Sequence, residues 1–330
     1  MLSRTTKTAM QPKPFNFMLP ALLAAALWFL PEMTGLHSPA GSRPFVLLGT
    51  YTLFSLPSAV AHVVQFFVCL AVWFCIMTLC ENKKIIPVRS ALPFSVGIIL
   101  SSAVSYTQYF DHQTVAFILF LLAFHQLLSM YGMDNRLSSA FNITLLLSLS
   151  SLFNPCYTFL LPLFLLGMFI FRALSLRIIL AALTGVLLPA FLLVSAFFLT
   201  DSMESLGSVF AGLRFYDFSR VEMPRSNIFM AASLLIVSAV SLISYFVTSV
   251  NYTLNVRLNF IFINWSFWLS LGWTLLFFHS YTDIIAVPLF FIVLCLSLYF
   301  STNYNKVSSV LFLLFIAVCA AYRIFRIFGL

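Results

Sequence analysis

This chain contains eleven apolar runs, which follow one another along its length and are separated by polar stretches. A bilayer offers no water to backbone N–H and C=O groups, so a run that crosses it has to be helical. Crossing takes about 20 residues, and several runs fall short, so their helices extend into the flanking segments or re-enter the membrane. The predicted fold is all-α, a polytopic transmembrane helix bundle with about eleven spans, namely Phe15–Leu30, Ala59–Cys80, Leu92–Ser105, Thr114–Tyr131, Ser138–Phe153, Tyr157–Phe171, Ile178–Thr200, Asn227–Val250, Phe260–Phe278, Ile284–Phe300 and Val307–Ala321.

The balance of apolar and charged residues excludes a soluble globular protein. Apolar residues make up 62% of the 330 residues and charged residues only 8%, whereas a soluble domain carries roughly 25% charged residues. The mean hydropathy is +1.05, and too few polar side chains are present to cover a globule of this size. We expect the 39 Phe side chains to cover surfaces that face lipid, and the six Cys to be small buried residues.

Lysine and arginine are distributed unevenly between the two sides of these spans. No small-residue cleavage site follows the first run, so we interpret it as a span and not as a cleaved signal peptide. With the N-terminus inside, eleven of the seventeen cations lie on the inner side: Arg4, Lys7, Lys13, Lys83, Lys84, Arg89, Arg136, Arg172, Arg177, Arg257 and Lys306. This bias predicts an inner (plasma) membrane protein with a cytoplasmic N-terminus. Along the sequence the cations are scattered between the apolar runs, so a nucleic-acid partner is not expected.

Two outer segments are longer than the tight inner turns. One runs from Pro31 to about Pro57, and the other from Asp201 to about Ser226. The second mixes aromatic residues with charges, which is typical of a helix that lies in the membrane interface. We expect a single transmembrane domain, with a module of seven spans over residues 1–200, an outer loop with an interfacial helix over residues 201–226, and four C-terminal spans over residues 227–330.

Acidic residues and histidines gather on the side opposite to most of the cations. Glu32 follows the first span, Asp111 and His112 precede the fourth, and His279 lies near another outer helix end. Charges have to lie in the loops of a membrane protein, so topology alone can produce this pattern. A carboxylate held at a helix end can also act on a lipid headgroup as a base. We therefore take Glu32 and Asp111 as candidate catalytic residues, and His112 and His279 as candidate substrate-binding residues.

The familiar catalytic motifs are missing from the sequence. It contains no P-loop, dinucleotide-binding, HExxH, paired CxxC or Gly-x-Ser-x-Gly motif. ATP hydrolysis is therefore not expected, no metal site is predicted, and no cofactor is indicated. We expect no Asp, Glu, Lys or Arg deep within a span, and this argues against a proton- or ion-coupled pump. With eleven spans Arg323 and Arg326 follow the last span on the outer side, and they lie on the inner side if one short span has been miscounted.

The segment from Thr114 to Leu193 contains two basic inner turns, MDNR and RALSLR, and a hairpin of two spans with the turn NPCY. This arrangement resembles the central helices of the GT-C superfamily, which are membrane glycosyltransferases that use polyprenyl-phosphate-linked sugars. The chain is also similar to inner-membrane proteins common in Bacteroidota. The resemblance implies that the first seven helices form a GT-C-like module.

The resemblance also implies an activity, the transfer of a sugar from a polyprenyl-phosphate donor on the outer face. Glu32 would be the catalytic acidic residue of the first outer loop, and Asp111 would assist it. The donor phosphate would be bound by Arg214, Arg220 and Arg225 in the loop after the seventh span, which suits the guanidinium fork. An inactive relative that binds a lipid-linked glycan, a structural subunit with partners in a cell-envelope complex, and a lipid transporter or flippase are the alternatives.

Overall fold

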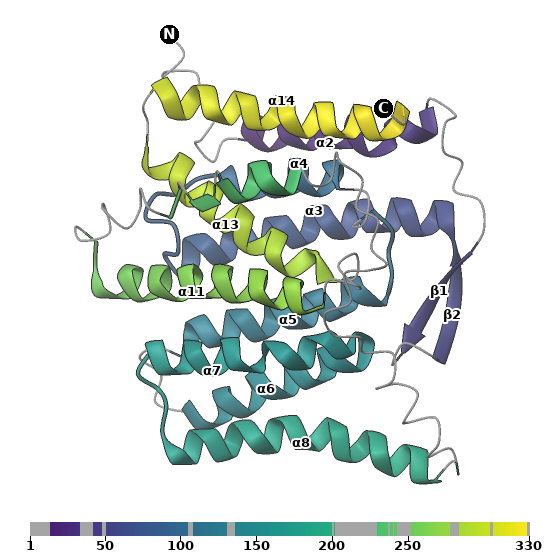
Figure 1. The fold of residues 1–330 in the computed structure, drawn as a ribbon, viewed down its shortest axis with the longest axis vertical. Helices are drawn as coiled ribbons and strands as arrows, with labels where there is room; N and C mark the ends of the chain where they lie inside the picture. Colours follow the sequence, from purple (N-terminus) through teal and green to yellow (C-terminus); the bar gives the residue numbers. More distant parts are fainter. Residues whose placement is uncertain are drawn as a thin grey trace.

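The computed structural model describes residues 14–33, 42–47, 51–104, 108–130, 136–199, 201, 230–236, 238–239, 241–242, 252–277, 284–303 and 306–328. Most helices in these ranges lie side by side along one direction (Figure 1). The elements are α2 (Pro14–Met33), β1 (Ser42–Leu47), β2 (Tyr51–Pro57), α3 (Ser58–Asn82), α4 (Leu92–Ala103), α5 (His112–Ser129), α6 (Arg136–Phe153), the 3-10 helix η2 (Pro155–Leu160), α7 (Leu161–Ile170), α8 (Leu176–Leu199), α11 (Leu254–Leu276), α13 (Ala286–Thr302) and α14 (Lys306–Phe328).

The predicted helical bundle is confirmed for this part of the chain, and its apolar helices are those of a membrane-embedded protein. Among the described residues, five helices are long and apolar enough to cross a membrane. They are Ser58–Asn82, His112–Ser129, Arg136–Phe153, Leu176–Leu199 and Ser308–Phe325. Shorter apolar helices lie at Phe17–Leu30, Leu92–Ala103, Pro155–Ile170 and Ala286–Thr302. The total of eleven spans stays a prediction.

A two-stranded antiparallel hairpin, which the sequence did not lead us to expect, lies between α2 and α3. Ser42 pairs with Pro57 and Leu47 with Tyr51, and the register shifts between Phe45 and Val46. β2 leads directly into α3 at Ser58. The strands contain Phe45, Val46, Tyr51, Thr52 and Phe54, which are residue types that favour strands. The hairpin occupies part of the first of the two longer segments.

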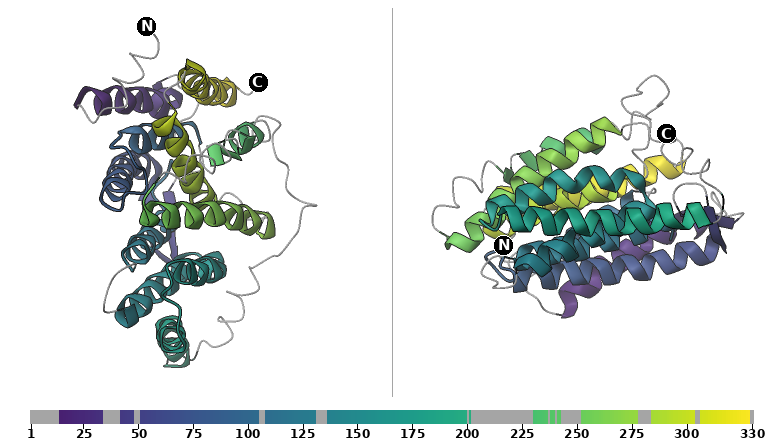
Figure 2. Two further views of the ribbon diagram at one scale, coloured as in Figure 1. Left: turned by 90° about the vertical axis from the view of Figure 1, so that its left-hand side faces the viewer. Right: turned by 90° about the horizontal axis from the view of Figure 1, so that it is seen from below.

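The helices pack beside one another in a stack (Figures 1 and 2). Some helices in contact are consecutive in the sequence, and others are far apart in it. α2 and α14 lie together at one edge, where both contact α4. α8 forms the opposite edge and packs against α6. Gly185 allows this contact to be close, because a Cβ there would meet the side chain of Thr144 and lie 2.6 Å from the carbonyl oxygen of Phe141. α13 packs against α4 and α11, and nearly all its side chains are buried.

The centre of the bundle is an aromatic core, and this corrects the expectation that the Phe side chains face lipid. Phe124 of α5 packs edge-on against Phe290 of α13, with 5.1 Å between ring centroids, and stacks on Phe262 of α11 at 5.7 Å. Other Phe residues, such as Phe169 and Phe191, are exposed. Five Cys are buried as expected, whereas Cys75 is exposed on α3.

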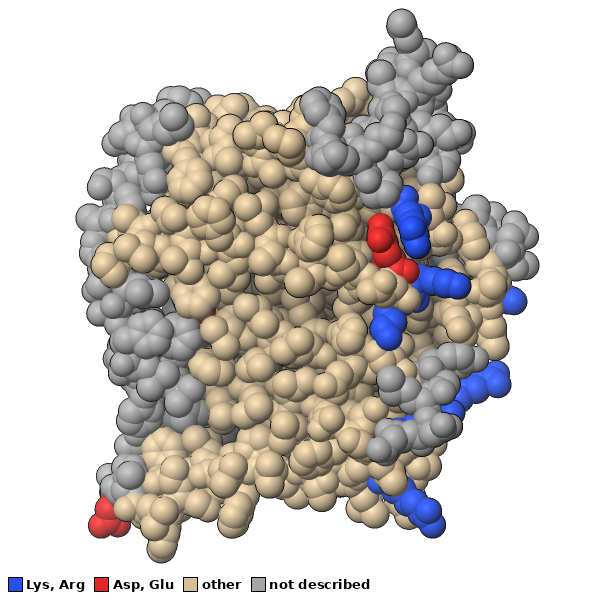
Figure 3. Space-filling model, turned by 180° about the vertical axis from the view of Figure 1, so that it is seen from behind, with Lys and Arg blue, Asp and Glu red and all other residues tan. Residues whose placement is uncertain are grey.

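The two ends of the bundle differ in charge. Eight Lys or Arg side chains are described, and seven of them lie together along one edge of the molecule (Figure 3). We call this edge the basic end, defined by Lys83, Lys84, Arg89, Arg136, Arg172, Arg177 and Arg257. The opposite, acid end comprises Asp111, Asp201, the last turns of α2, α4 and α14 and the first turns of α3, α5 and α13. The predicted separation of these groups between two sides therefore holds for the described side chains.

Candidate functional site

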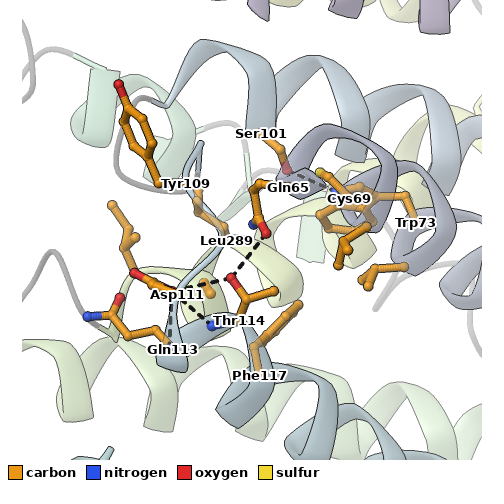
Figure 4. A pocket seen from close by; sticks show the side chains of 14 residues that line it. Gln65, Cys69, Trp73, Ser101, Tyr109, Asp111, Gln113, Thr114, Phe117 and Leu289 are labelled. Carbon is orange, nitrogen blue, oxygen red and sulfur yellow. Dashed lines mark hydrogen bonds between the residues drawn. The ribbon is translucent and has the colours of Figure 1, made fainter. Parts of the chain in front are cut away.

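A pocket opens at the acid end, where α3, α4, α5 and α13 meet the segment 108–111 (Figure 4). Its polar wall is made by Gln65 of α3, Ser101 of α4, Tyr109 and Asp111 of the segment, and Gln113 and Thr114 of α5. Its apolar wall is made by Val68, Cys69, Val72, Trp73, Phe117, Ile285, Ala286 and Leu289. One side of the pocket can thus bind polar groups and the other can bind hydrocarbon.

Asp111 is the acidic residue among those that line the pocket, and it also precedes α5. Its Oδ1 accepts hydrogen bonds from the backbone N–H groups of Gln113 and Thr114, each at 3.1 Å, so it is the N-cap of this helix. The Thr114 hydroxyl lies 3.3 Å from the same oxygen and 3.2 Å from Oε1 of Gln65. The cap holds the carboxylate in a defined position at the helix end.

The size of the pocket limits what it can hold. Its volume is about 70 Å³, whereas one ordered water needs ~10–15 Å³. Typical small-molecule sites occupy ~300–1,000 Å³. The pocket therefore accommodates a few waters or part of a polar headgroup, and the remainder of a larger ligand has to lie outside it.

Arg323 is buried close to this site, which corrects the expectation that it follows the last span. It lies within α14 and is only 3% exposed. Its Nε donates to the carbonyl oxygen of Leu27 in α2 at 3.2 Å, and its Nη2 donates to Oε1 of Gln108 at 2.8 Å. The Gln108 amide donates in turn to the carbonyl oxygen of Ser102 in α4 at 2.8 Å. Helix C-termini carry partial negative charge, and the ends of α2, α4 and α14 converge here, which favours a cation.

Aromatic stacking connects the same elements. His62 of α3 stacks on Trp28 of α2, with 5.6 Å between centroids, and lies 5.3 Å from the ring of Tyr109. The N–H of Phe110 donates to the carbonyl oxygen of Ala61 at 3.1 Å. Tyr109 lines the pocket, so this part of the pocket wall is supported by the rings of His62 and Trp28 and by the contacts of Arg323. The segment 108–111 is therefore held from three sides.

The structure brings some of the predicted site residues to one end of the bundle. Asp111 lines the pocket, whereas His112 begins α5 without lining it. Glu32 lies in the last turn of α2, at the acid end, and its side chain lies outside the described residues. The other predicted binding residues, Arg214, Arg220, Arg225 and His279, also lie outside the described residues, as does the expected interfacial helix.

Four residues near Asp111 were missed by sequence reasoning. Gln65 and Thr114 are polar residues inside or at the start of apolar runs, a signal that could have marked them. Gln108 and Arg323 gave no such signal, because each is the partner of the other and 215 residues of chain separate them.

The comparisons with known proteins add nothing to this geometry. No protein-family model, no curated protein and no solved structure matches the chain. The functional interpretation therefore rests on the described residues and on the sequence resemblance.

Proposed function

We propose that this chain is an inner (plasma) membrane protein whose acid end faces away from the cytoplasm and binds a polyprenyl-phosphate-linked sugar, from which it transfers the sugar. The observation that carries the proposal is the position of Asp111. This carboxylate lies on the wall of a pocket at the end of helices whose outer surfaces are apolar. A lipid in the surrounding bilayer would present its headgroup at the level of the helix ends.

The residues of the pocket have roles that suit such a ligand. Sugar hydroxyls can donate to the Asp111 carboxylate and exchange hydrogen bonds with Gln65 and Thr114. A carboxylate in contact with an acceptor hydroxyl can remove its proton as a general base. In the GT-C-like scheme Glu32 shares this work. Arg214, Arg220 and Arg225 would bind the donor phosphate outside the pocket.

The test is photocrosslinking and turnover in lipid nanodiscs, using a polyprenyl-phosphate sugar that carries a diazirine and an added hydroxyl acceptor, whose oxygen replaces the phosphate on the sugar. Wild-type protein should crosslink through the pocket and release polyprenyl phosphate. Asp111→Asn keeps a good N-cap residue but removes the charge, so it should still fold and crosslink while the release of polyprenyl phosphate falls by roughly 100-fold or more, as for loss of a general base.

A pair of Phe substitutions supplies the matched control. Ala286→Phe fills the pocket and should abolish crosslinking. Ala190→Phe places the same ring on an exposed position of α8 and should have no effect. Crosslinking by Ala286→Phe at the wild-type level would contradict binding at this pocket. Crosslinking without release in the wild-type protein would contradict sugar transfer and leave a protein that binds a lipid-linked glycan.

The proposed orientation has its own test. In a Cys75→Ala background, Lys84→Cys should be labelled by a membrane-impermeant maleimide only from the cytoplasmic side, and Asp201→Cys only from the opposite side. Lys84 follows the end of α3 at the basic end, and Asp201 follows the end of α8 at the acid end (Figure 1). Labelling of both from one side would rule out the proposed orientation.

A further inference from the structure

The basic end carries a concentration of charge that the proposed sugar transfer does not use. Lys84, Arg89, Arg172, Arg177 and Arg257 are all exposed there. Glu81 is the acidic side chain described at this end (Figure 3). The described part of this end is therefore strongly positive, and it lies at the other end of the helices from Asp111.

Exposed apolar side chains stand next to these cations in the sequence. Val88 precedes Arg89 and is 41% exposed, and Leu176 precedes Arg177 and is 74% exposed. Leu254 begins α11 one turn before Arg257 and is 50% exposed. A soluble acidic partner would need the charges but not these apolar neighbours. Alternation of cations and exposed aliphatic residues is the pattern of a surface at the boundary between headgroups and acyl chains.

Two of the cations occupy positions where the backbone favours glycine. Lys84 follows the C-cap of α3 with φ 51°, and Arg172 follows the C-cap of α7 with φ 53°. Both turns are Schellman motifs, because the N–H of Ile85 donates to Cys80 and that of Ala173 donates to Met168. Glycine usually occupies this left-handed position. In both turns the charged side chain is exposed at the basic end.

The turns that carry the cations are fixed to neighbouring helices. Nη1 of Arg136 donates to the carbonyl oxygen of Arg172 at 3.2 Å, which joins α6 to the end of α7. Nδ2 of Asn259 donates to the carbonyl oxygen of Lys83 at 3.0 Å, which joins α11 to the end of α3. The cations are thus presented from a connected surface and not from independent loops.

We infer that the basic end is a binding surface for anionic phospholipid headgroups of the adjacent leaflet. Exposed guanidinium and ammonium groups contact lipid phosphates, while Val88, Leu176 and Leu254 contact the upper parts of the acyl chains. Arginine suits this role, because its fork donates two hydrogen bonds to a phosphate. The surface is independent of Asp111, so it stands whether or not the chain transfers sugar.

The experiment uses the full chain in nanodiscs of equimolar phosphatidylglycerol and phosphatidylcholine, with the lipids next to the protein detected by spin-labelled analogues. Wild-type protein should prefer the spin-labelled phosphatidylglycerol, and added salt should weaken the preference. The double variant Lys84→Gly/Arg172→Gly should lower the preference by roughly five-fold for each cation, the factor that corresponds to ~1 kcal/mol per surface cation.

The charge-conserving double variant Lys84→Arg/Arg172→Lys is the matched control and should keep the wild-type preference. Glycine suits both backbone positions, so loss of lipid preference in the Gly variant cannot be ascribed to damage to the fold. An unchanged preference in the Gly variant would overturn the proposal. Displacement of the lipid by soluble glycerophosphate at equal concentration would also overturn it, because the surface would then recognise phosphate without a leaflet.

Discussion

Nη2 of Arg323 donates a hydrogen bond to Oε1 of Gln108 at 2.8 Å, although 215 residues separate the two along the chain. The contact joins α14 to the segment that ends in Asp111, and the Nε bond to Leu27 extends it to α2. The position of Asp111 therefore depends on α14, a helix that lies far further along the chain.

Arg323→Met should destabilise the protein by about 1–3 kcal/mol, because the Oε1 of Gln108 and the Leu27 carbonyl oxygen lose a buried donor. Thermal unfolding in detergent measures the change. Arg323→Lys should recover only part of the loss, since one ammonium group cannot reproduce the two directions of the fork. Arg257→Met, at an exposed position, is the control and should change the stability little. Equal stability of Arg323→Met and wild type would show that the contact contributes nothing.

Substitutions at Asp111 should separate the cap from the charge. Asp111→Ala removes the acceptor for the N–H groups of Gln113 and Thr114 and should cost about 1 kcal/mol of stability. Asp111→Asn should stay within a few tenths of wild type, because Asn caps helices as well as Asp does. Unfolding by denaturant, followed by circular dichroism, provides the comparison. Equal losses in the Asn and Ala variants would mean that the charge, which both remove, and not the cap, stabilises this end.

Gly97→Ala should disturb the pocket through Trp73. The added Cβ would lie 2.7 Å from Cε2 of the indole and closer still to other ring atoms. The ring is buried and its Nε1 donates to Ser101 at 2.9 Å, so it has little freedom to move. We expect a loss of about 1–3 kcal/mol, as for overpacked cores.

Gly272→Ala is the matched control for that change. Nothing lies within 4 Å of a Cβ at this position in α11, so Ala should raise the stability by up to about 1 kcal/mol through its helix preference. In a Trp73→Phe background the cost of Gly97→Ala should shrink. An undiminished cost there would locate the clash elsewhere.

Lys84→Gly should make the protein more stable than Lys84→Ala by about 1 kcal/mol, because only glycine adopts the left-handed conformation without strain. The same difference is expected at Arg172, whose φ is 53°. Both substitutions remove the side chain, so the comparison isolates the backbone. Equal melting temperatures of the Gly and Ala variants would show that these turns carry no strain.

Within the described residues most predicted spans correspond to helices, because an apolar run ends at a polar or proline-containing stretch, where the helix leaves the bilayer. The predicted span Asn227–Val250 lies largely outside the described residues. The run Ile178–Thr200 corresponds to α8 at Leu176–Leu199, and Ser138–Phe153 corresponds to α6 at Arg136–Phe153. The hairpin was missed because its strands, of 6 and 7 residues, are much shorter than a span. They lie in a segment that the apolar pattern marks only as a loop. Apolar content also failed to tell the buried Phe124 from the exposed Phe169, because in lipid both surfaces are apolar.

The candidate site could be predicted only in part. Asp111 was found because it stands alone at the start of an apolar run, where a cap is expected. Arg323 was placed outside the last span, because a cation near the end of an apolar run usually leaves the membrane. The Arg323 guanidinium can be buried because three helix ends and the side chain of Gln108 surround it. These groups come together only in the folded protein, so no local sequence pattern predicts them.

The contact between α2 and α14 sets an order for biogenesis. Leu27 is synthesised 296 residues before Arg323, so at ~5–20 residues per second α2 leaves the ribosome roughly 15–60 s before its partner. During that interval the edge of α2 and α4 that α14 later covers is open to lipid, insertase or protease. Release from the translocation machinery with a native acid end therefore waits for α14.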